Sequence, residues 1–168
     1  MVFAISLSAQ TAAQNGHPGK NRARHADRGT PGYANGAVAF PVGRLRAQLA
    51  RNIEEAKTKG SVARVLENFD SYRTMLWVLG RSSGADVDAH WDEIVLAEQG
   101  GATLVTGGRV IDGQTDANGE THGMRIEGGR FQSVGAGDIV TIQAGTPHQM
   151  LLPPGTVFSA FVIQVREP

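Results

Sequence analysis

The stretch that decides the fold is Gly137-Asp-Ile-Val-Thr-Ile-Gln-Ala-Gly145-Thr-Pro-His148. A run of four apolar or β-branched residues is followed by glycine and proline, which are the residues that mark tight turns. The pattern predicts a short strand, a glycine turn and a histidine that opens the next strand. In that next strand His148 would share a face with Met150 and Leu152, because residues two apart in a strand point to the same side.

A second cluster of ligand-type side chains lies upstream, in Asp88-Ala-His90-Trp-Asp-Glu93. In a continuous strand Asp88 and His90 share a face, and a bend or bulge near Trp91 would bring Glu93 to the same side. If this cluster meets His148, the set of two imidazoles and one or two carboxylates suits Fe, Mn, Ni or Zn and leaves coordination positions open. The same residues are also compatible with hydrogen-bonded strand histidines and solvated carboxylates.

Chain length, net charge and amino-acid composition limit the number of domains, the kinds of partner and the fold class that this protein can have. The chain has 168 residues, enough for one well-buried domain, and its 16 basic and 16 acidic residues balance to a net charge of zero. Without a basic surplus there is no field to attract nucleic acid, so we expect a small molecule or another protein as partner. The absence of cysteine excludes disulfides and thiolate metal sites. The 22 glycines favour many short strands joined by turns.

The N-terminal part divides into segments of different composition. Residues 1–14 contain a short apolar run that resembles the end of a signal peptide, and a disordered end is the alternative. An exported, periplasmic or extracellular location is therefore expected, with a cytoplasmic one as the alternative. Residues 15–38 are rich in Gly, Pro and Arg and predict a flexible linker. Apolar residues at spacings of three and four predict an amphipathic helix from Pro41 to Lys59, within a helical arm spanning residues 39–71.

A barrel is expected over residues 72–168. Many short, alternating segments separated by turn residues are typical of an antiparallel sandwich or barrel. No segment has the run of about 20 apolar residues that a membrane span needs. The predicted strands are Tyr72 to Leu79, Val87 to His90, Glu93 to Glu98, Ala102 to Thr106, Met124 to Ile126, Phe131 to Val134, Asp138 to Ile142, His148 to Leu152 and Val157 to Val165.

The two motifs resemble those of the cupin superfamily. The stretch ending at His148 looks like the second cupin motif, and Glu93 followed by Gly100 looks like the end of the first, with Asp88-Ala-His90 where a His-x-His pair is expected. The resemblance covers about residues 72–165 and is similar to small single-domain bacterial cupins, often exported. Asp88 takes the place of the first motif histidine, and Leu152 stands where asparagine is common. Pairing His90 with Asp92 as the His-x-His equivalent leaves no glutamate at matching distance, so the first register is kept.

The resemblance implies a mainly β protein, a single jelly-roll antiparallel β-barrel with one N-terminal helix. It also implies a divalent transition metal, Fe, Mn, Ni or Zn, at His90, Glu93 and His148, with Asp88 as a fourth ligand or its neighbour. The function expected is a metal-binding cupin, and the enzyme activities that the resemblance implies are those of a dioxygenase, isomerase or lyase on a small organic substrate. No catalytic residue is assigned. The alternatives are a non-catalytic small-molecule-binding cupin and an assembly protein, since such barrels often form homodimers.

Four further residues are expected to line the ligand pocket. Trp91 lies beside the ligand cluster. His122 lies on a long polar loop, where its position favours a plain surface histidine over a pocket residue. Met150 and Leu152 follow His148 at the spacing of one strand face and would form an apolar wall.

Overall fold

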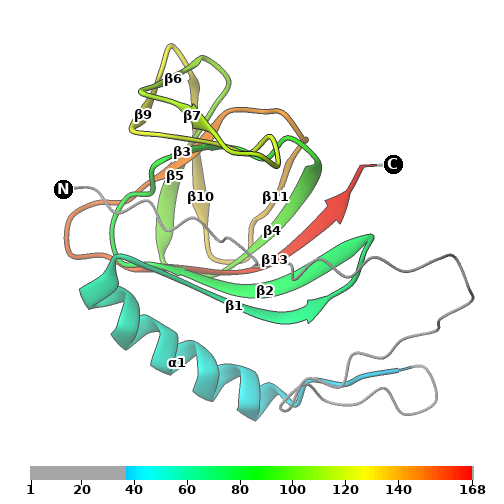
Figure 1. Ribbon diagram of the computed structural model, residues 1–168. Helices are drawn as coiled ribbons and strands as arrows, with labels where there is room; N and C mark the ends of the chain where they lie inside the picture. The colour runs from blue at the N-terminus through cyan, green and yellow to red at the C-terminus, as the bar shows by residue number, and fades with distance from the viewer. Residues whose placement is uncertain (1–36, 168) are drawn as a thin grey trace, which may run out of the picture.

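The computed structural model describes residues 37–167, so the signal-peptide remnant and nearly all of the linker lie outside the described residues. Within these described residues, one helix is followed by thirteen strands (Figure 1). Their bounds are α1 Val42–Lys59, β1 Ser61–Asn68, β2 Tyr72–Leu79, β3 Ala85–Val87, β4 Trp91–Gln99, β5 Gly101–Thr106, β6 Arg109–Ile111, β7 Gln114–Thr115, β8 Thr121–Gly123, β9 Arg125–Glu127, β10 Arg130–Gly135, β11 Ile139–Ile142, β12 His148–Leu151 and β13 Phe158–Arg166.

Two antiparallel sheets form the barrel. One has the strand order β1-β2-β13-β4-β11 and the other β10-β5-β12-β3-β8-β7, while β6 and β9 form a separate two-stranded sheet at one end (Figure 1). Alternate residues of each strand point between the sheets, where they exclude water from the main apolar core. Leu79, Phe158 and Ala160 are among its most deeply buried side chains. The expected antiparallel barrel is therefore confirmed.

The helix α1 covers the outer face of β1 and β2 (Figure 1). Leu49, Ile53 and Ala56 lie at helical spacing and pack against Val62 and Val78 of these strands. The helix ends at Gly60, whose φ of 90° is readily adopted only by glycine and whose N–H donates to the Ala56 carbonyl. The predicted helix is thus confirmed. Within residues 37–167 no helix has both the length and the apolar character of a membrane span.

The close approach of α1 to β2 depends on Gly80. An ideal Cβ at this position would lie 2.4 Å from the Ala56 carbonyl oxygen, a contact that the helix could relieve only by moving away. We expect Gly80→Ala to lower the free energy of unfolding by roughly 1–3 kcal/mol, measured by urea denaturation. Gly43→Ala is the matched control, because a Cβ there meets nothing within 4 Å and alanine favours helix. Equal losses in the two variants would contradict this account.

The structure differs from the sequence prediction mainly before Tyr72 and between β5 and β10. Strand β1 lies within the segment expected as a helical arm, and it pairs with β2 along its whole length. A register shift between Val65 and Glu67 interrupts the alternation by which a strand is recognised. The predicted long loop contains β7 and β8, which are too short to show any period. Both β1 and β8, which the sequence did not predict as strands, contribute residues to the cavity at the mouth of the barrel.

Candidate metal centre

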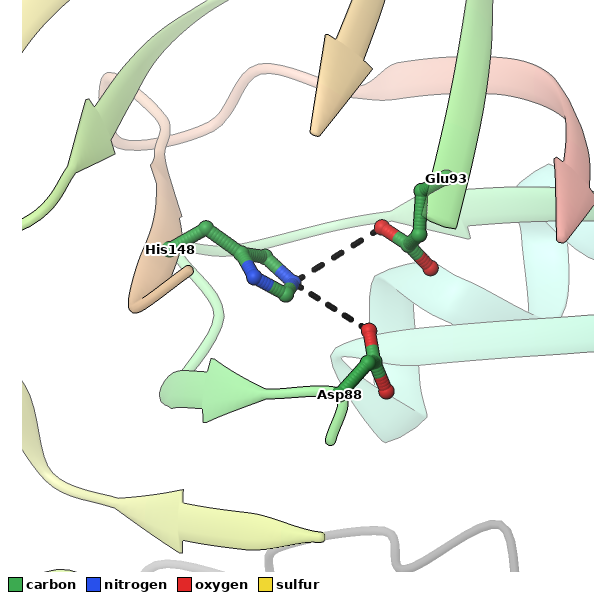
Figure 2. A group of neighbouring side chains, drawn as sticks. All are labelled: Asp88, Glu93 and His148. Carbon is green, nitrogen blue, oxygen red and sulfur yellow. Dashed lines mark ion pairs between the residues drawn. The ribbon is translucent and has the colours of Figure 1, made fainter. Parts of the chain in front are cut away.

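The stretch from Gly137 to His148 is hydrogen-bonded through its backbone N–H groups to the segment from Asp88 to Glu93. Gly145 donates its N–H to the Asp88 carbonyl at 2.8 Å, and Ala144 donates to the Asp92 carboxylate, also at 2.8 Å. Because these bonds hold the glycine turn against the turn that joins β3 to β4, the start of β12 lies beside the start of β4. His148, Asp88 and Glu93 consequently converge from three segments (Figure 2).

Figure 2 shows the imidazole of His148 facing both carboxylates. Its Nε2 lies 3.7 Å from Asp88 Oδ2 and 3.7 Å from Glu93 Oε2. These separations are too long for good hydrogen bonds. Two ligand atoms each about 2.1 Å from a shared metal stand roughly 3–3.7 Å apart, depending on the coordination angle. The spacing therefore fits ligands of one ion better than a directly bonded pair.

The other ring nitrogen of His148 fixes the imidazole's orientation. Nδ1 lies 3.0 Å from the Thr146 carbonyl oxygen, which can only accept, so Nδ1 carries the proton and donates it. In the neutral ring this leaves the Nε2 lone pair directed at Asp88 and Glu93. Metal-bound histidines are held in the same way in other proteins. The donor set of one imidazole nitrogen and two carboxylate oxygens, with all three ligand atoms within 4.8 Å of one another, fits a divalent transition metal.

Burial of like charges perturbs the titration of this group. Loss of hydration raises the pKa of Asp88 to about 6, and the nearby Glu93 charge contributes in the same direction. Burial lowers the pKa of His148, but the charges of Glu93 and Asp88 and the bond to Thr146 outweigh it, and the net pKa is raised. Two carboxylates beside one imidazole hold an excess of negative charge that a cation would neutralise.

The structure places the predicted ligand His90 elsewhere. Strand β3 ends at Val87, and Ala89 and His90 form a turn, so the alternation assumed for Asp88 and His90 does not apply. His90 is exposed and is not part of the group formed by the described residues.

A cavity of about 330 Å³ adjoins the three converging side chains, a size suited to a small ligand. His122 and Met150 lie on its wall, with Asp88, Glu93 and His148. Leu152 is buried in the core, and the Trp91 ring contacts two arginines; among residues 37–167 neither is part of this wall.

Sequence reasoning missed several polar residues around the cavity. The Asp86 carboxylate on β3 shares a hydrogen bond of 2.7 Å with His122 Nδ1. This bond holds the His122 imidazole in place on the cavity wall. Glu120 accepts from the Ala89 N–H at 3.0 Å and shares a hydrogen bond with the Asp88 carboxyl. Burial and the Asp88 charge raise the pKa of Glu120.

Two more missed residues face the cavity from the opposite sheet, Arg73 on β2 and Gln164 on β13. Each stands on the inward side of a strand whose other inward residues are apolar. That break in the pattern is the signal by which the sequence could have identified them.

No protein-family model matches the sequence, and no curated protein is significantly similar to it. Solved structures do resemble it. A cupin 2 conserved barrel domain protein from Salinispora arenicola is 22% identical, covering 62% of this chain and 75% of its own, with a TM-score of 0.44. The Bacillus halodurans protein BH2720 is 17% identical, covering 80% of this chain and 86% of its own, with a TM-score of 0.52.

A conserved protein with a double-stranded β-helix domain from Klebsiella pneumoniae is 15% identical, covering 63% of this chain and 76% of its own, with a TM-score of 0.47. At these identities the likeness concerns the fold. The chain is therefore an antiparallel two-sheet barrel similar to solved structures described as a cupin barrel and a double-stranded β-helix domain, in line with the resemblance noted in its sequence.

Proposed function

We propose that the protein is a metal-binding cupin in which Asp88, Glu93 and His148 hold one divalent transition metal, Fe, Mn, Ni or Zn. The observation that supports the proposal is the convergence of three ligand atoms within 4.8 Å on the wall of a cavity. Metal ligands beside a cavity can place a bound molecule at an open coordination position. When bound, such a metal supplies a Lewis acid for a small organic substrate.

The surrounding side chains support catalysis as well as binding. Thr146 orients the His148 ring, and Gln164 donates a hydrogen bond to Glu93 Oε1. The Asp86 and His122 pair provides an imidazole near the three ligands, in place to accept a proton from a bound molecule. These features fit an enzyme of the dioxygenase, isomerase or lyase type. The fold does not select among these reactions.

Elemental analysis of the purified protein tests the proposal. We expect about one metal ion per chain in the parent after reconstitution, and loss of that ion in His148→Ala and in Glu93→Ala. His90→Ala is the matched control, because it removes an exposed imidazole outside the group and should leave the metal content unchanged. Equal loss in His90→Ala and His148→Ala would show that the ligand set is different.

A second candidate function is a metal-free binding module for a small molecule. The observation that favours it is the presence of Arg73 and of a His148 with a raised pKa, which can partly balance the two carboxylates without a metal. No metal in the parent protein under any reconstitution condition would leave this reading in place of the first.

A further inference from the structure

A polar row crosses three neighbouring strands at the mouth of the barrel. Arg73 on β2, Gln164 on β13 and Glu93 on β4 are register partners, so they stand side by side. Arg73 donates its Nε–H to Gln164 Oε1, and Gln164 donates its Nε2–H to Glu93 Oε1. This chain of bonds holds the Arg73 guanidinium at one end of the row and a predicted metal ligand at the other.

Arg73 differs from the other cations of the cavity wall. Lys59 and Arg64 each have a nitrogen 2.6 Å from a carboxylate oxygen of Glu55. Among residues 37–167, Arg73 has no carboxylate within ion-pair distance, and its two Nη groups have no hydrogen-bond partner. The guanidinium carbon lies 4.7 Å from the centre of the Trp91 ring, which fixes the plane of the group. Partly buried donors of this kind are stabilised by an acceptor, and a guanidinium fork matches a carboxylate.

Apolar side chains cover the wall next to Arg73. Met75 and Trp77 follow it at alternate positions of β2, and Val162 is the register partner of Met75 on β13. The cavity thus offers a cation at one place and a hydrocarbon surface beside it. A divalent metal would balance the charges of Asp88 and Glu93, and Arg73 would then leave this part of the cavity positively charged.

We propose that the cavity binds a small organic carboxylate, whose carboxylate group pairs with the Nη groups of Arg73 while its hydrocarbon part packs on Met75, Trp77 and Val162. The inference rests on the proposed function and specifies its substrate class. It assigns to Arg73 a specificity-determining role that is distinct from holding Glu93 in place.

Calorimetric titration of the full chain tests this assignment. The probes are butanoate and benzoate, compared with the neutral amides butanamide and benzamide of nearly the same shape, in protein loaded with Zn²⁺ and in protein freed of metal by chelation. We expect each carboxylate to bind the Zn²⁺ form at least about tenfold more tightly than its amide. Arg73→Gln should remove that preference, and Arg73→Lys should keep part of it, because lysine retains the charge without the fork.

The matched control is Arg166→Gln. Arg166 also stacks on the Trp91 ring, with its guanidinium carbon 5.5 Å from the ring centre, but it is exposed and not on the cavity wall. We expect it to keep the preference. Metal affinity separates binding from support of Glu93: Arg73→Gln should leave Zn²⁺ affinity unchanged or raise it, since a cation near the two carboxylates is removed. Loss of Zn²⁺, of the amides and of the carboxylates together would assign Arg73 a purely structural role and overturn the proposal.

The outcomes for substrate class and for metal binding are distinguishable. Zn²⁺ binding with no preference for carboxylates over amides would overturn this inference and leave the proposed metal function intact. An Arg73-dependent preference in a protein that binds no metal would support the inference while the metal function fails.

Discussion

Replacing Asp88 with asparagine should stabilise the metal-free protein at pH 7.5 and remove its stabilisation by metal. Burial raises the pKa of Asp88 from 3.8 to about 6, so at pH 7.5 the folded protein carries a carboxylate that the unfolded chain accommodates more easily. One pKa unit corresponds to about 1.4 kcal/mol, which makes the cost of this charge on the order of 3 kcal/mol. Asparagine has nearly the same shape without the charge. We expect a higher melting temperature for metal-free Asp88→Asn than for the metal-free parent.

The sign of this effect depends on pH. Between about pH 4 and 6 the folded state binds more protons than the unfolded state, so the parent loses stability as the pH rises through that window. Near pH 4 Asp88 is largely protonated in the folded protein, and the advantage of Asp88→Asn should shrink. Equal melting temperatures of parent and variant at pH 7.5 would contradict a destabilising buried charge at this position.

Adding Zn²⁺ should reverse the order of the two proteins. A ligand that binds only the folded state stabilises it in proportion to the logarithm of its concentration over its dissociation constant. The parent should gain several degrees, while Asp88→Asn should gain little because its Zn²⁺ affinity is expected to fall roughly 100-fold or more. Thermal scans of both proteins with and without Zn²⁺ measure whether the order of their melting temperatures reverses.

The sequence predicted the elements whose patterns are local. The helix α1 is marked by its apolar spacing and by Gly60, and β2 by the alternation around Trp77. The strand β1 was missed because its register shift breaks the alternation, and because its apolar residues pack partly on α1 instead of on the barrel core. Pairing with β2 supplies the hydrogen bonds that define it as a strand, and such pairing is not visible in a single segment.

The group of three converging side chains could be predicted in part for the same reason. His148 and Glu93 follow from motifs that each lie in one segment. Both Asp88 and His90 were predicted as ligands, and whether they share a face depends on where β3 ends. The N–H of Gly145 bonds to the Asp88 carbonyl across the barrel mouth, at the point where the strand stops. A strand continued to His90 would have placed both side chains on one face. The turn that replaces it directs Asp88 inward and leaves His90 exposed.

Arg73 and Gln164 required the tertiary structure. They are 91 residues apart and become neighbours of Glu93 only because β13 lies between β2 and β4. The sequence alone shows a single polar residue on the apolar face of each of these two strands and does not show which residue it contacts. The order of strands in the sheet places Arg73, Gln164 and Glu93 side by side.

Metal affinity should fall steeply as the pH is lowered from 7 to 5. Metal ligands bind in their deprotonated forms, so each proton that must be displaced costs affinity. With a pKa of about 6, Asp88 alone should lower the affinity for Zn²⁺ by about tenfold over these two pH units. The pKa of His148 is also raised, and its proton occupies the ring nitrogen that faces the carboxylates, so the combined loss should exceed tenfold. Competition with a chromophoric chelator, corrected for the chelator's own protonation, measures the profile.

The same profile in His90→Ala would assign the titration to the buried group. His90 is an exposed imidazole that lies outside the three converging side chains, so its removal should leave the curve unchanged. In Asp88→Asn the residual Zn²⁺ binding should depend on fewer protons and show a shallower slope. An affinity for Zn²⁺ that stays constant from pH 7 to 5 would mean that neither Asp88 nor His148 binds the metal, because neither could ligate it while keeping its proton.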